Sequence, residues 1–194
     1  MKYFISAAVI FLALFNFGCS ENKTDVSEEQ VIGMRTTAME FMKNLKGVLI
    51  TQIQTSGVLQ AVSVCSDTAQ ILTNNFGVQK GVFIKRVSFK NRNANNSPDD
   101  FEKKVLNKFE LLNQNKELNE TTEYVEIVQE GEFRYLRYLK PIVLQAECIN
   151  CHGSEADIMP EVKQLIAQEY TDDKAVGYRI GDLRGAVSLK KVIE

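Results

Sequence analysis

The spacing of hydrophobic residues predicts two long helices in the first part of the chain. From Ser27 onward, apolar side chains recur every three or four positions, which places them on one face of a helix that runs to Leu49. This stripe consists of Val31, Met34, Ala38, Phe41, Met42, Leu45, Val48 and Leu49. A second helix with the same spacing covers 58–74, and Cys65 lies on its apolar face. We expect it to stop at 74–75, with Gly77 helping to end it.

The remaining pattern predicts an antiparallel sheet and two shorter helices. Strand-like runs cover 81–89, 121–129, 133–145 and 185–193. Helical segments cover 97–112 and 161–170. The turn at 130–132 separates two of the strand-like runs, so we expect those two to form a hairpin. Helices at the N-terminal end, followed by an antiparallel sheet, make the predicted fold class α+β.

The N-terminal end has the pattern of an export signal. Lys2 supplies a positive charge, and 3–15 is an apolar run too short for a comfortable membrane span, so 1–18 is predicted to be a signal peptide. A glycine directly before Cys19 resembles the cleavage site of bacterial lipoproteins, after which Cys19 becomes the lipidated first residue. An ordinary export signal that is cut nearby, or an uncleaved anchor, is the alternative. We expect the protein on the periplasmic side of a bacterial membrane, anchored through this lipid.

The predicted organisation is a short tether followed by one domain. Residues 19–27 are polar, and 28–194 have the length of a single domain with one core. The 23 basic and 25 acidic residues nearly balance and form no basic cluster, so nucleic acid is not expected as a partner. We expect no transmitter domain in the same chain, so a separate redox or signalling protein is the expected partner.

The pentapeptide Cys148-Ile149-Asn150-Cys151-His152 carries the most specific chemical signal in the chain. C-x-x-C-H is the attachment motif of c-type haem, in which two thiols form thioethers and the imidazole becomes an iron ligand. A zinc site needs further ligands, yet the chain has one histidine and no second C-x-x-C. A thioredoxin-like pair gains nothing from His152. The motif therefore predicts one covalent haem c with its iron, bound through Cys148, Cys151 and His152.

Residue chemistry leaves several candidates for the ligand on the opposite side of the iron. Cys65 has no disulfide partner in prospect, and a thiol left alone in an oxidising compartment is prone to oxidation unless something occupies it. A second histidine is excluded, which leaves Cys65, a methionine, or an open or water-filled position. The methionines in question are Met34, Met39, Met42 and Met159. Of these, Met34 and Met42 lie on the apolar stripe and suit core packing.

Several segments resemble the Tll-like haem domain, a single-haem c-type module with a PAS-like fold that occurs alone or as the extracytoplasmic part of bacterial sensors. The matching segments span most of the mature chain in the order found in that family. They are 61–65, 84–95, 98–102, 138–142, 148–153, 172–178 and 181–188. The resemblance implies a PAS-like antiparallel sheet with flanking helices and long N-terminal helices packed alongside.

The same resemblance bears on the iron ligands. In that family the iron is held by the motif histidine and by a cysteine from an upstream helix, which implies His152 and Cys65 here. Arg86 and Arg92, in a predicted strand and the loop after it, are candidates for binding the haem propionates, because a guanidinium pairs bidentately with a carboxylate. The alternative is that one or both face solvent.

Three uses of such a haem compete. A redox or small-ligand sensor is favoured by the PAS-like resemblance, since Cys65 can leave on reduction or protonation and admit a diatomic gas. A lipid-tethered electron-transfer cytochrome is the alternative, because it needs no output domain. A peroxidase-like enzyme requires a distal acid–base group, typically a histidine with an arginine. The single histidine argues against it, and we expect the protein not to be an enzyme.

Overall fold

The structure is a computed structural model that describes residues 26–193. The predictions for the signal peptide, for Cys19 and for most of the tether concern residues outside this range.

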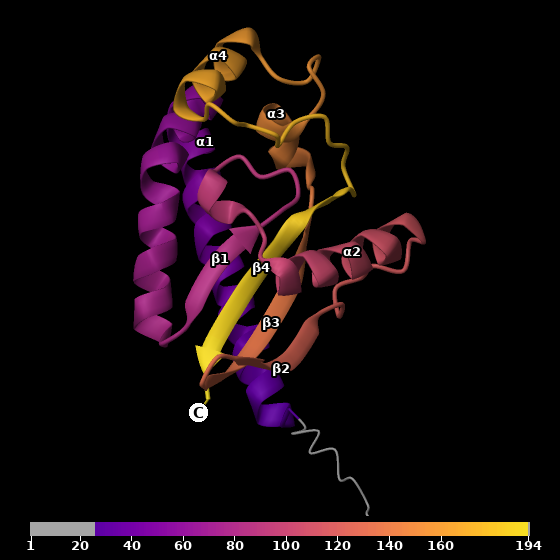
Figure 1. Cartoon of the computed structure of the whole chain (residues 1–194). Coiled ribbons are helices and arrows are strands. Elements are labelled where there is room, and N and C mark those ends of the chain that lie inside the picture. The colour runs from indigo at the N-terminus through magenta and orange to yellow at the C-terminus, as the bar shows by residue number, and fades with distance from the viewer. Residues whose placement is uncertain (1–25, 194) are drawn as a thin grey trace, which may run out of the picture.

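The first described element, α1 (Glu28–Lys80), is a helical hairpin (Figure 1). It begins at Ser27, whose hydroxyl accepts the backbone N–H of Gln30, while the Gln30 side chain accepts the N–H of Ser27. At Gly57 the backbone leaves the helical conformation, with φ 82° and ψ 171°. Only glycine adopts this region without strain, so Gly57 is the position at which the chain can reverse.

The two arms of α1 run antiparallel. The ring centroids of Phe41, in the first arm, and Phe76, in the second, lie 5.5 Å apart. The ammonium of Lys80 lies 2.7 Å from the carboxylate of Glu40. Contacts between the middle of the first arm and the end of the second require the chain to fold back between them, as the break at Gly57 allows.

Both arms are longer than the sequence pattern predicted, since the first continues past Leu49 to the break at Gly57 and the second continues past Asn74. The expected stop at 74–75 is wrong, because the helix continues to Lys80 and ends at Gly81, which has the left-handed conformation with φ 64°. Gly77 lies inside the helix, where an added Cβ would be 2.8 Å from the carbonyl oxygen of Val82. A glycine is needed here because the backbone at Val82 passes close to the helix, and it does not mark the end of the helix. Packing against the first arm overrides the weak breaking signal of two asparagines.

Four strands form one antiparallel sheet in the order β1-β4-β3-β2. They are β1 (Phe83–Val87), β2 (Tyr124–Glu130), β3 (Phe133–Val143) and β4 (Leu183–Val192). The predicted hairpin is present, with Glu130 paired to Phe133 across a turn in which Gly131 has φ 64°. The predicted fold class, α+β with an antiparallel sheet and long N-terminal helices, is confirmed.

The sheet lies between α1 on one face and α2 (Asp100–Gln114) on the other (Figure 1). Alternate residues of the strands point to opposite faces, so that Leu139 packs toward α2 and its neighbour Tyr138 packs toward α1. The core toward α1 contains Met34, Ala38, Phe41, Phe76, Leu136, Tyr138, Val187 and Leu189. The core toward α2 contains Val87, Val105, Leu106, Phe109, Leu139 and Ala186.

The C-x-x-C-H motif follows β3 and lies at one end of the sheet, near the turn of α1 (Figure 1). The 3-10 turn Ala146–Cys148 leads into the short helix α3 (Ile149–His152). Helix α4 (Pro160–Glu169) then packs against the second arm of α1 around Val62. The loop after α4 passes beside α3 on its way to β4 and also bonds to the loop after β1. Three segments distant in sequence therefore meet here: the motif segment, the loop after β1 and the loop after α4.

The role of Gly57 predicts opposite effects for two glycine replacements in α1. Gly57→Ala should lower the free energy of unfolding by about 1–3 kcal/mol, because alanine is strained at this φ and ψ. An added Cβ would meet no atom within 4 Å, so the cost arises from the backbone alone. Gly47 is the matched control: it is helical with equally open surroundings, and Gly47→Ala should stabilise by roughly 0.5–1 kcal/mol. Urea unfolding followed by circular dichroism measures both; the same change in both variants would contradict the turn at Gly57.

Candidate functional site

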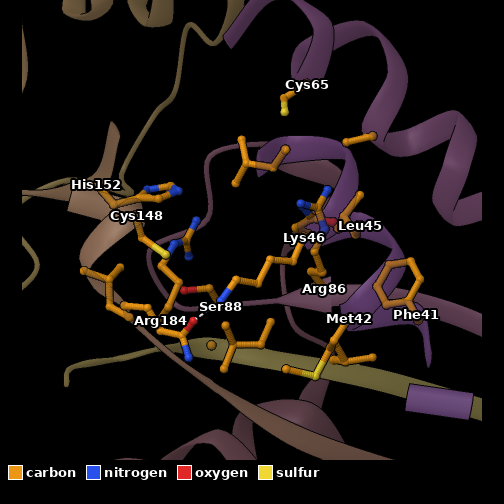
Figure 2. Close-up of a pocket in the computed structure, with 18 of the residues that line it drawn as sticks. Phe41, Met42, Leu45, Lys46, Cys65, Arg86, Ser88, Cys148, His152 and Arg184 are labelled. Carbon is orange, nitrogen blue, oxygen red and sulfur yellow. Dashed lines mark hydrogen bonds between the residues drawn. The ribbon is translucent and has the colours of Figure 1, made fainter. Parts of the chain in front are cut away.

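A large cavity lies between the α1 hairpin, the sheet and the C-x-x-C-H motif (Figure 2). Its volume is about 1530 Å³, above the range of about 300–1,000 Å³ typical of small-molecule sites. Cys65, Cys148, Cys151 and His152 all line it. The fold therefore brings the four predicted haem-binding side chains, which come from two distant segments of the chain, to the wall of one cavity.

The wall that α1 contributes is strongly apolar. An 18-residue window of this helix has a mean hydropathy of 1.3, apolar enough by length and composition to cross a membrane, yet only 11% of it is buried inside the structure. Apolar residues of α1 that line the cavity include Leu45, Val48, Leu49, Ile53, Val58, Val62 and Leu72. Because uncovered apolar surface is unfavourable in water, this wall is suited to a large apolar ligand.

His152 ends α3 and directs its ring into the cavity (Figure 2). Its Nδ1 lies 2.7 Å from the carbonyl oxygen of Ala175, which accepts the ring proton and leaves Nε2 free of that bond. Burial, together with the positive charges of Arg184 and Arg92, holds the pKa of His152 well below its usual range. The imidazole is therefore neutral at pH 7, which is the form that binds metals.

Cys65 lies on the second arm of α1, and its sulfur also points into the cavity (Figure 2). It is partly buried, and the three cysteines among the described residues are all free thiols. Burial raises the pKa of the Cys65 thiol, whereas the positive charge of Arg86 acts to lower it. Burial is the larger effect, so the pKa of the Cys65 thiol is raised overall and Arg86 offsets only part of the rise.

The methionine alternatives separate by position. Met34 is buried in the core between α1 and the sheet, and Met159 is half exposed and does not line the cavity. Met39 and Met42 do line it, although Met42 also packs against the core of the sheet. Among residues 26–193, Cys65, Met39 and Met42 are therefore the sulfur donors on the cavity wall besides the motif cysteines.

Arg92, a predicted propionate partner, lines the cavity but is already engaged by the protein. Its Nε lies 3.1 Å from a carboxylate oxygen of Asp173, in an ion pair shielded from solvent. Its Nη2 donates to the carbonyl oxygen of Cys151 at 2.6 Å and reaches that of Ala175 at 3.4 Å. These contacts compete with the propionate role that the sequence predicted.

Two other guanidinium groups in the cavity wall lack a carboxylate partner among the described residues. Arg86 extends from β1 and Arg184 from β4, and the Nε atom of each is buried without a hydrogen-bond partner. Arg184 donates from Nη1 to the carbonyl oxygen of Lys90 at 3.2 Å. Burial lowers the pKa of both arginines. The ring of Tyr178 lies 5.4 Å from the Arg184 guanidinium, but neither arginine has an ion-pair partner among the described residues. A partly buried charge without a counter-ion is unfavourable, so these two groups favour an anionic ligand.

Arg86 was predicted as a propionate partner, whereas the place of Arg184 in the cavity wall was not predicted. Arg184 lies in the segment 181–188, which resembles the family, but nothing in its spacing shows that it reaches the cavity. An arginine directly before the run Gly185-Ala186-Val187 was the available signal.

The residues around the cavity fit a c-type haem. Two thiols and a neutral imidazole on one short segment form the attachment set, and Cys65 offers a second axial ligand from another wall. The apolar surface of α1 suits the porphyrin face. The two uncompensated guanidinium groups of Arg86 and Arg184 match the two propionates of a haem in number and in charge.

The fold and the site define an α+β domain in which a helical hairpin and an antiparallel sheet enclose a cavity at the C-x-x-C-H motif. A family model described as Tll0287-like matches residues 21–191, and the chain belongs to this family. The predicted family resemblance is thereby confirmed.

One solved structure shares the fold. The crystal structure of the cyanobacterial heme-protein Tll0287 is similar with a TM-score of 0.64 and 23% sequence identity. The similarity covers 87% of this chain and 98% of that chain. Comparison with curated protein sequences gave no match.

The uncompensated guanidinium groups predict that the haem-free protein is destabilised by its own binding site. In a haem-free protein carrying Cys148→Ser and Cys151→Ser, the further change Arg86→Met should raise the free energy of unfolding by more than about 1 kcal/mol, because it removes a buried charge. Arg179→Met, at an exposed position, is the control and should have little effect. Urea unfolding measures both; a loss of stability in Arg86→Met would show that the guanidinium is satisfied without a ligand.

Proposed function

We propose that the protein binds one haem covalently as haem c, with His152 and Cys65 as the two axial ligands of the iron. The observation that carries this proposal is that Cys148, Cys151, His152 and Cys65 line one cavity of sufficient volume. The description of the similar Tll0287 structure as a heme-protein supports the same ligand. Cys65 is favoured over Met39 and Met42 because the family resemblance implies a cysteine from an upstream helix at this position, and because Met42 also packs against the core of the sheet.

When bound, haem supplies an iron that exchanges between the ferric and ferrous states and accepts axial ligands. The chain supplies the rest of the site. Cys148 and Cys151 anchor the group, the apolar wall of α1 excludes water, and the carbonyl of Ala175 holds the imidazole of His152 in one tautomer. Arg86 and Arg184 provide the positive charge that the propionates require.

The proposed biological role is that of a redox or small-ligand sensor rather than an enzyme. Cys65 lies on the second arm of a hairpin that reverses at Gly57, so the bound or free state of its thiolate is coupled to the position of that arm. Such an element has the two states that a switch requires. A diatomic gas is the proposed ligand class, and a separate protein would read the position of the arm. Catalysis is not proposed, because the only histidine of the chain is an iron ligand.

The alternative role is electron transfer, and the surface beside the motif favours it. Val176 and Ile180 are exposed apolar residues of the loop that is bonded to α3, and Met159 is exposed just before α4. An apolar surface next to the attachment motif would let a redox partner approach the edge of the haem.

Export and lipid anchoring on the periplasmic side of a bacterial membrane complete the proposal. The support comes from the apolar run at 3–15, the Gly18-Cys19 pair and the polar tether over 19–27. Attachment of haem c agrees with this location, because bacteria attach it outside the cytoplasm.

The axial role of Cys65 is tested by replacing it. Cys65→Ala should retain covalent haem, because Cys148, Cys151 and His152 are unchanged, but its visible spectrum should differ. Its midpoint potential should rise, since a thiolate stabilises ferric iron. Optical spectroscopy and a redox titration measure both effects.

Met39→Leu and Met42→Leu are the matched controls for this test, because they remove the other two sulfur donors of the cavity wall. Both should keep the spectrum and potential of the unmodified protein. A spectral change in one of the methionine variants, with none in Cys65→Ala, would transfer the axial role to that methionine.

The sensor and carrier roles are separated by adding carbon monoxide to the reduced, haem-loaded protein. We expect prompt binding that displaces Cys65 and shifts the Soret band, as a small-ligand sensor requires. Cys65→Ala should bind the gas faster, because no thiolate competes for the position. An inert haem that nevertheless exchanges electrons rapidly would favour the carrier instead.

A further inference from the structure

The loop after α4 holds the C-x-x-C-H motif through its backbone and through the histidine ring. The N–H of Gly177 donates to the carbonyl oxygen of Gly153 at 2.7 Å, and that of Tyr178 donates to the carbonyl oxygen of His152 at 3.0 Å. The carbonyl oxygen of Ala175 accepts the Nδ1 proton of His152 at 2.7 Å. The orientation of the imidazole therefore depends on where this loop places the Ala175 peptide.

A shielded ion pair fixes that peptide. The side chains of Arg92 and Asp173 are only 13% and 11% exposed, and Nε lies 3.1 Å from Oδ1. The same Oδ1 accepts the backbone N–H of Ala175 at 2.8 Å. Arg92 Nη2 donates to the carbonyl of Cys151 at 2.6 Å and reaches that of Ala175 at 3.4 Å. The ring of Tyr170 lies 5.8 Å from the same guanidinium. One arginine thus joins the loop after β1, the motif helix and the loop after α4.

We propose that Arg92 and Asp173 are positioning residues for the axial histidine, which rests on the proposed binding of haem. The pair holds the Ala175 carbonyl, and this carbonyl sets the ring plane and the tautomer of His152. Groups that bond to the second nitrogen of a ligating histidine control its orientation and its strength as a ligand. The propionates are left to Arg86 and Arg184, whose Nε atoms have no partner among the described residues.

Two conservative replacements test the pair in the haem-loaded protein. Asp173→Asn keeps the shape of the side chain and removes its charge, whereas Arg92→Lys keeps the charge and removes the fork that joins three groups. Both should retain covalent haem but change the g values of the ferric electron paramagnetic resonance spectrum, which report the orientation of the imidazole plane. In the double variant the change should not exceed the larger single change, because the two residues act as one unit.

The midpoint potential separates positioning from charge. Asp173→Asn should raise the potential, because the charge of Arg92 is left uncompensated near the iron, whereas Arg92→Lys should leave it close to that of the unmodified protein. Asp172→Asn makes the same charge change at the preceding, exposed position and should alter neither the g values nor the potential.

Several outcomes would overturn the inference. A shifted potential with unchanged g values in Asp173→Asn would show that the pair acts on the iron through its charge and does not position the imidazole. Changed g values in Arg92→Lys alone would assign Arg92 to a propionate, as the sequence first indicated. An unmodified protein that incorporates no haem would overturn the proposed function along with this inference, whereas unaffected variants of a haem-loaded protein would overturn only the role of the pair.

Discussion

The contact between the α1 hairpin and the sheet is the constraint on which the cavity depends. Met34, Ala38 and Phe41 of the first arm and Phe76 of the second pack on the sheet and close the core. Beyond this contact, and apart from the residues around Val62 that pack on α4, apolar residues of both arms line the cavity. The hairpin therefore builds the core with one part and exposes an apolar wall with the other. Covering this wall with an apolar group is favourable, because it removes apolar surface from water.

The opposite side of the cavity adds a requirement for negative charge. Arg86 and Arg184 extend from neighbouring strands of the sheet and have no carboxylate partner among the described residues, whereas Arg92 is paired with Asp173. A haem meets both requirements, with an apolar ring for α1 and two propionates for the arginines. Its binding would add to the stability of the fold, because the haem-free site contains unfavourable groups on both sides.

Local patterns predicted most of the secondary structure. The three- and four-residue spacing located both arms of α1, and the turn at Gly131 marked the hairpin of β2 and β3. The end of the second arm at Lys80 was not predictable, because packing against the first arm carries the helix through two asparagines that favour a stop.

By itself, the sequence determined what depends on neighbouring residues: the α+β class, and the spacing that places Cys148, Cys151 and His152 on one short segment. Tertiary structure alone decided which distant groups meet them. Cys65 reaches the same cavity because α1 reverses and packs on the sheet, and Arg92 turns to Asp173 because the loop after α4 passes beside the motif. Such pairings depend on the path of the whole chain, and no local spacing records them.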